Sequence, residues 1–75
     1  MGQVTAKING RTYRFQCPEG QEDRLKLVAS YLSDKVEELI AQFGQVGEDR
    51  LLAMAAILIA DELFDAREAV EKAGQ

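Results

Sequence analysis

The strongest constraint on this chain is the apolar pattern of residues 48–73, which has helical spacing on two faces at once. One stripe repeats at alternating steps of four and three residues, the spacing of a coiled-coil heptad: Leu52, Ala56, Ile59, Leu63, Ala66, Val70 and Ala73. A second stripe lies on the first half of the same segment: Leu51, Met54, Ala55 and Leu58. A helix that is apolar on two sides has to be covered on two sides. The rest of the chain can cover one of them, so the pattern predicts a partner chain on the other.

Size and composition also favour self-association. A chain of 75 residues forms one domain, residues 1–75, and a domain this small needs a disulfide, a metal or a second chain for support. One cysteine and no histidine leave no internal disulfide and none of the usual zinc ligand sets. We therefore predict a homodimer. The predicted dimer interface comprises Leu52, Ala56, Ile59, Leu63, Ala66 and Val70.

The same composition argues against an enzyme. Without histidine the chain lacks the side chain that most often acts as a base near neutral pH. Cys17 has no such base to activate it and continues the apolar alternation of the preceding residues, so we interpret it as a packing residue. We expect no catalytic residues, no cofactor and no metal site.

The first part of the chain predicts a β-hairpin over residues 3–17. Apolar and polar residues alternate on both sides of Asn9-Gly10, a pair typical of the two-residue turn that requires positive φ at both positions. This turn pairs Val4 with Phe15 and places the apolar residues of both strands on one face, with the polar residues on the other.

Two helices complete an expected α+β fold. The first is predicted over about residues 20–43 from a one-sided apolar stripe: Leu25, Ala29, Leu32, Val36, Leu39 and Phe43. Gly44 follows at the position of a helix stop, and a short linker leads to the second helix, predicted over about residues 48–73.

Charge is unevenly distributed along the chain. The net charge is −4, yet residues 1–17 contain Lys7, Arg11 and Arg14 and no acid. These bases either prevent aggregation through the strand edges or dock an acidic partner, and the sequence leaves both interpretations open. The main alternative function is a small dimeric nucleic-acid-binding module that uses the basic hairpin. It is disfavoured by the acidic balance and by a hairpin that closes within one chain.

A membrane location is not expected. The apolar run Leu51–Ala60 is ten residues long, about half of what a bilayer span requires. No amino-terminal signal segment is visible, so we expect a cytoplasmic protein.

Two blocks of the sequence resemble the ZapA family of bacterial cell-division proteins. The first is Ile8-Asn9-Gly10-Arg11 with Tyr13 and then Cys17-Pro18, and the second is Leu51 followed by residues 54–63, MAAILIADEL. The resemblance runs from about Val4 to Leu63. It implies a non-enzymatic cytoplasmic protein at the division septum, which dimerises through the second helix, often forms tetramers and cross-links filaments of the tubulin-like protein FtsZ.

The resemblance also implies which residues contact FtsZ. By position these are Arg11 in the hairpin turn and Asp49 near the start of the second helix, with Arg14, Lys35, Glu48 and Arg50 as neighbours. The chain departs from the family pattern in two places. Leu58 stands where many members have asparagine, and the longer coiled coil of many members is missing. Since the heptads stop abruptly near Gly74, we expect these residues to be part of a longer protein.

Overall fold

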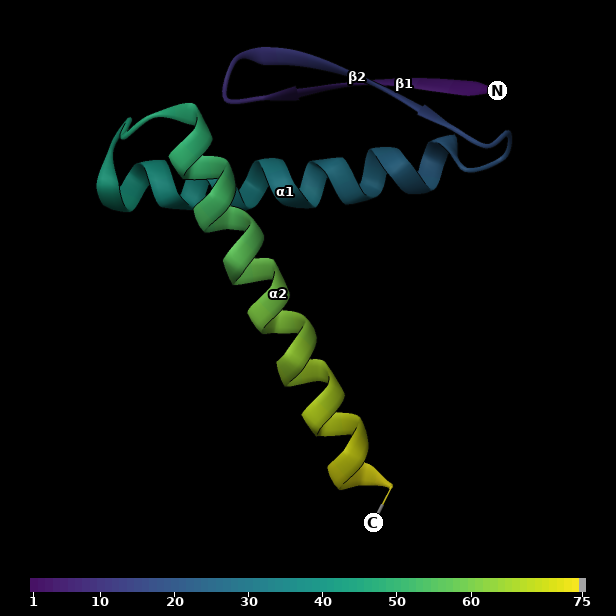
Figure 1. The fold of residues 1–75 in the computed structure, drawn as a ribbon, viewed down its shortest axis with the longest axis vertical. Helices are drawn as coiled ribbons and strands as arrows, with labels where there is room; N and C mark the ends of the chain where they lie inside the picture. The colour runs from purple at the N-terminus through teal and green to yellow at the C-terminus, as the bar shows by residue number, and fades with distance from the viewer. Residues whose placement is uncertain (75) are drawn as a thin grey trace.

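The computed structural model describes residues 1–74 and shows the predicted α+β architecture (Figure 1). An antiparallel hairpin of β1 (Gly2–Ile8) and β2 (Arg11–Cys17) precedes two helices, α1 (Glu22–Phe43) and α2 (Glu48–Ala73). The hairpin runs alongside α1, and α2 crosses near the end of α1 and continues away from both (Figure 1). We call the hairpin, α1 and the first half of α2 the head, and residues 63–73 the rod. Every rod residue is exposed.

The hairpin has the register that the alternation predicts. Val4 pairs with Phe15, and Ile8 pairs with Arg11 across the turn. Asn9 and Gly10 have φ of 52° and 78°, so both central residues of the turn take the positive φ that the Asn-Gly pair indicated. One face of the hairpin consequently carries its apolar side chains toward α1.

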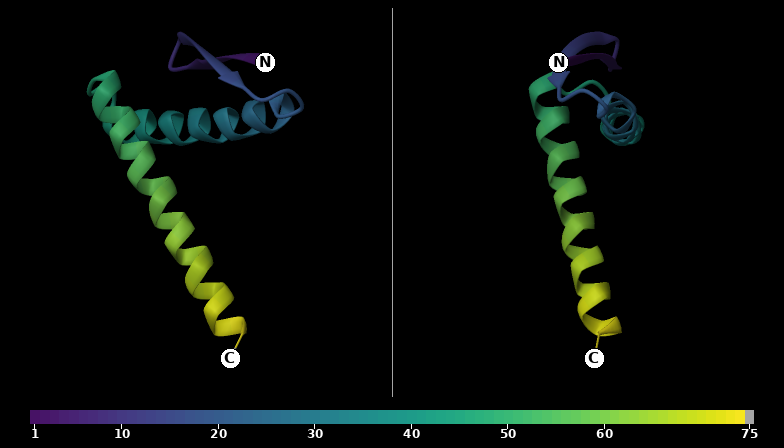
Figure 2. Two further views of the ribbon diagram at one scale, coloured as in Figure 1. Left: turned by 45° about the vertical axis from the view of Figure 1, so that its right-hand side comes forward. Right: turned by 90° about the vertical axis from the view of Figure 1, so that its right-hand side faces the viewer.

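The core lies where the hairpin, α1 and α2 meet. Its buried members come from three elements: Ile8, Val36, Leu39, Leu51 and Ala55. Cys17 is also buried, as its place in the alternation predicted. The hairpin rests on α1 through β1, whereas β2 lies on the outer side (Figure 2). Phe15 on β2 therefore stays 38% exposed, although it belongs to the apolar face.

Glycine residues determine where the helices begin and end. Gly20 has φ of 90°, which is not helical, and α1 begins two residues later at Glu22. Gly44 has φ of 79°, a backbone conformation that side-chain-bearing residues rarely adopt, and its N–H donates to the Ile40 carbonyl at 2.8 Å. The chain then reverses over residues 45–47, which directs α2 back across α1.

Neither helix of residues 1–74 is long and apolar enough to cross a membrane.

Candidate functional site

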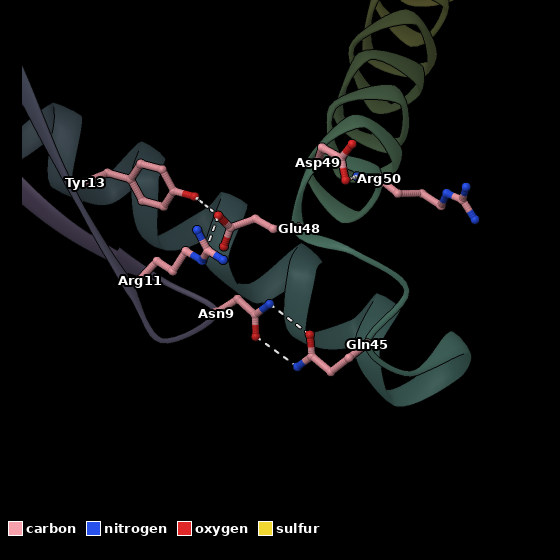
Figure 3. Close-up of polar contacts among 7 residues, drawn as sticks. All are labelled: Asn9, Arg11, Tyr13, Gln45, Glu48, Asp49 and Arg50. Atoms are coloured by element: carbon pink, nitrogen blue, oxygen red, sulfur yellow. Dashed lines mark hydrogen bonds and ion pairs between the residues drawn. The ribbon is translucent and has the colours of Figure 1, made fainter.

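The tip of the hairpin is fastened to the linker and to the start of α2 by side chains (Figure 3). Asn9 in the turn and Gln45 in the linker exchange two amide hydrogen bonds, each 3.0 Å long. Glu48, the first residue of α2, reaches back to Arg11 and Tyr13 on β2. We call these five residues, Asn9, Arg11, Tyr13, Gln45 and Glu48, the hairpin-tip cluster.

Glu48 is the centre of this cluster. Its Oε2 accepts a hydrogen bond from the Tyr13 hydroxyl at 2.6 Å and forms an ion pair with the Arg11 Nε at 3.1 Å. Its Oε1 is buried and has no hydrogen-bond partner within residues 1–74. The hydrogen bond to the Glu48 carboxylate raises the pKa of the Tyr13 hydroxyl, because a donated proton is harder to remove.

The register of the hairpin explains why Arg11 belongs to the hairpin-tip cluster. Arg11, Tyr13 and Phe15 occupy alternate positions of β2 and therefore share the face that carries the apolar residues. Arg11 lies at the edge of that face, where α2 begins, so its guanidinium meets Glu48. The sequence places Arg11 at the hairpin turn but does not identify its partner. This partner could not be predicted, because local sequence patterns do not indicate where α2 begins in space relative to the hairpin.

Asp49 and Arg50 differ from Glu48 in orientation. The Asp49 Oδ1 accepts a hydrogen bond from the Arg50 backbone N–H at 2.9 Å, which satisfies a free donor of the first turn of α2. The Arg50 side chain extends away from Arg11 (Figure 3). Both residues are exposed, and neither forms an ion pair in the described part of the chain.

Arg14 lies on the other face of the hairpin. It pairs with Thr5 across the strands, and Lys7 pairs with Thr12, so both bases point away from the core as the alternation predicts. Within residues 1–74 neither base has an acidic partner within ion-pair distance. The outward face of the hairpin is therefore a small exposed basic surface.

Lys35 lies apart from the hairpin-tip cluster, between α1 and α2. Its Nζ is 2.7 Å from a carboxylate oxygen of Glu62 and 3.7 Å from one of Glu38, and its side chain is 17% exposed. The Tyr31 hydroxyl donates a hydrogen bond to the other Glu62 oxygen, and Lys35 lies over the Tyr31 ring. We call Tyr31, Lys35 and Glu62 the inter-helix brace.

Each member of the brace has a shifted pKa. Hydrogen bonds from Lys35 and, next in weight, from Tyr31 lower the pKa of Glu62. The hydrogen bond to Glu62 raises the pKa of Lys35 and that of Tyr31. The brace is therefore fully formed when Glu62 is charged and both partners are protonated.

The apolar stripes of α2 differ in how the chain covers them. Leu51 and Ala55 of the second stripe are fully buried against α1 and the hairpin. The heptad stripe is left open: Leu52 and Ile59 are half-buried, Ala56 and Ala66 are exposed, and Leu63 and Val70 are 50% and 72% exposed. The chain by itself thus covers the second stripe at Leu51 and Ala55, while Leu58 of that stripe stays 40% exposed.

A third apolar stripe was missed by sequence analysis. Ile57 and Phe64 are 69% and 58% exposed, and with Ala53 and Ala60 they follow the same four-and-three spacing. The uninterrupted apolar run from Leu51 to Ala60 was the signal, since such a run is apolar on every side of a helix.

The described residues contain no group of three or more histidine, cysteine or acidic side chains placed to hold a metal ion.

Comparison with known proteins points to one family. The family model "Cell division protein ZapA" matches residues 4–75. Among curated relatives named Cell division protein ZapA, that of Pseudomonas aeruginosa PAO1 is 29% identical over 69 residues, covering 92% of this chain and 66% of the relative. That of Mannheimia succiniciproducens is 30% identical over 74 residues, covering 96% and 69%. That of Erwinia tasmaniensis is 33% identical over 60 residues, covering 80% and 55%. The chain thus spans about two thirds or less of the length of these relatives.

A solved structure has the same fold. It is described as an unknown conserved bacterial protein from Pseudomonas aeruginosa PAO1 and superposes with a TM-score of 0.85 at 28% identity. The superposition covers 96% of this chain and 79% of that one.

Proposed function

The chain belongs to the ZapA family of cell-division proteins, and from this premise we propose that it binds FtsZ and cross-links FtsZ filaments at the division ring. It acts as a homodimer or homotetramer, without catalysis, in the cytoplasm at the septum. Membership of the family supports the role in cell division. The steps from that role to FtsZ and to filament cross-linking are our proposal.

The observation that carries the proposal is the uncovered heptad stripe of α2. Leu63 and Val70 are half or more exposed, at positions that repeat with coiled-coil spacing. Exposed apolar residues in such a row mark a protein interface, and a second copy of α2 has the matching row. The supported assembly is a pair of heads joined by a helical rod.

Such an assembly cross-links by multivalency. One head binds a filament weakly, whereas heads held on one rigid rod engage neighbouring filaments at a high effective concentration. The symmetry of a dimer or tetramer also repeats the same geometry at each link, which aligns filaments.

The FtsZ contact is proposed on the charged surface of the head. The residues that the family resemblance suggests there are Arg11, Arg14, Lys35, Glu48, Asp49 and Arg50. Of these, Arg14, Asp49 and Arg50 are exposed and free of ion pairs within residues 1–74, which leaves their charges available to a partner. The nucleic-acid alternative has less support, because the charge of Arg11 is paired with Glu48.

Co-sedimentation with FtsZ polymers tests this proposal. We expect the protein to pellet with FtsZ polymers and to increase the amount of FtsZ in a low-speed pellet, which collects bundles. Leu63→Glu places a charge in the heptad stripe and should weaken self-association and remove bundling.

Leu27→Glu is the matched control, because Leu27 is 69% exposed on α1 and lies outside the heptad stripe. It should bundle FtsZ as the unchanged protein does. A protein that leaves FtsZ in the supernatant would contradict the proposal, and so would a Leu63→Glu variant that bundles normally.

A further inference from the structure

We propose that Arg11 and Glu48 serve FtsZ binding as positioning residues. They hold the tip of the hairpin against the start of α2 by pairing with each other, and neither uses its charge to contact the filament. The inference rests on the proposed function for its FtsZ measurement only, because the pairing itself concerns a single chain.

The Glu48 carboxylate is already occupied from within the chain. Its Oε2 has two partners, Tyr13 at 2.6 Å and Arg11 at 3.1 Å. Its Oε1 is buried, and the side chain as a whole is 20% exposed. A filament surface cannot reach the buried Oε1 unless the hairpin tip first moves away, and Oε2 already has two partners within the chain.

Arg11 is the other half of this arrangement. Its side chain is 70% exposed, but its Nε faces Glu48 (Figure 3). Within residues 1–74, Arg11 is the only cation within ion-pair distance of Glu48, so its guanidinium balances the charge of this partly buried carboxylate. Loss of Arg11 therefore leaves Glu48 with the Tyr13 hydroxyl alone.

The place of these contacts gives them a mechanical role. A two-stranded hairpin is marginally stable by itself, and this one rests on α1 through β1. Its tip is held by the hairpin-tip cluster, in which the Asn9–Gln45 pair fastens the turn and Arg11–Glu48 fastens the start of β2. The outward face with Arg14 is then presented at a fixed angle to Asp49 and Arg50.

Charge reversal distinguishes this role from direct contact. Arg11→Glu or Glu48→Arg sets two like charges against each other and should release the tip. The double swap Arg11→Glu/Glu48→Arg restores opposite charges. If both residues touched FtsZ separately, the swap would combine two defects.

The experiment compares the unchanged chain, the two single reversals and the swap. The first measurement is amide hydrogen exchange of residues 8–13, and the second is co-sedimentation with FtsZ polymers. Each single reversal should speed amide exchange of residues 8–13 about two- to fivefold, because a partly exposed ion pair makes only a small contribution to stability. The swap should return exchange to within about twofold of the unchanged chain and restore co-sedimentation. Arginine at position 48 is unfavourable at the N-terminus of α2, because it opposes the helix dipole, and this lowers overall stability in the swap as well. Restoration of the pair is therefore judged from amide exchange at the hairpin tip and not from overall stability.

Arg24→Glu is the control. Arg24 is an exposed arginine of α1 that has no ion pair in the described residues, so the same change of charge should leave both measurements unaltered.

The inference is overturned if the single reversals leave exchange at residues 8–13 unchanged. It is also overturned if the swap restores slow exchange but not co-sedimentation, because Arg11 or Glu48 would then contact FtsZ directly. If the unchanged chain fails to pellet with FtsZ, the proposed function fails. The exchange data then decide by themselves whether the Arg11–Glu48 pair holds the tip.

Discussion

Among single residues, Glu62 connects the two helices through side-chain charge. It lies on α2 just before the rod and contacts Lys35 and Tyr31 of α1. These contacts join the two helices and therefore bear on the angle between them. A carboxylate in this position resists changes of that angle, and the angle sets the direction of the rod.

The pKa shifts of the brace predict how it depends on pH. The pKa of Glu62 is lowered in the folded chain, so its contribution to stability is complete above the unfolded value of 4.5 and is lost as pH falls through the folded pKa. The pKa values of Lys35 and Tyr31 are raised, so their contributions are complete below about pH 10 and are lost as pH rises further.

We therefore expect Glu62→Gln to lower the free energy of unfolding at pH 7, and the difference from the unchanged chain to shrink below pH 4.5. Urea denaturation at matched protein concentration, at pH 7 and near pH 3, measures both differences. A gap of equal size at the two pH values would show that Glu62 does not act through its charge.

At the scale of elements, the head depends on how α2 packs against α1 and β1. Leu51 and Ala55 are fully buried there together with Val36 and Leu39 of α1. The hairpin contributes Ile8 to the same cluster. Because this core is small, each of its large side chains accounts for a sizeable share of the total stability.

Leu51→Ala tests this packing. Removing a fully buried leucine side chain costs about 2–5 kcal/mol of unfolding free energy, through lost transfer energy and the cavity left behind. Leu27→Ala removes the same atoms from a position that is 69% exposed and should cost about 0.5 kcal/mol or less. Urea unfolding followed by circular dichroism compares the two. Equal losses would contradict the assignment of Leu51 to the core.

Elements whose pattern is local could be predicted from the sequence. The Asn9-Gly10 turn and the two-residue alternation determine the hairpin register, and the apolar spacing indicates both helices. The partners of Lys35 and Arg11 could not be predicted in the same way. Both pairs depend on the angle between α1 and α2, which follows from the reversal over residues 45–47 and from packing at Leu51.

For the candidate site, the family resemblance indicated which residues to consider, and the structure showed which of them contact one another. Arg11 and Glu48 are brought together, Asp49 and Arg50 follow Glu48 in the first turn of α2, and Lys35 belongs to the brace. The third apolar stripe with Ile57 and Phe64 was not predicted. Residues 51–60 are all apolar, so the heptad spacing describes only some of the apolar positions in this run.

The whole molecule is a thin, open shape, with extents of 44 × 37 × 15 Å. The rod points away from the head (Figures 1 and 2), and the heptad stripe continues along the sequence from the first half of α2 into the rod. A single chain in this shape exposes Leu63, Phe64 and Val70 to water. Burial of these side chains by further copies is the simplest source of the stability that a head of this size lacks.

Sedimentation equilibrium of the chain over a dilution series tests whether α2 requires a partner chain. We predict a folded species of two or four times the 8.3 kDa chain mass, which dissociates on dilution with loss of helical signal. A species of 8.3 kDa that stays helical at every concentration would show that α2 needs no partner, and would contradict the account.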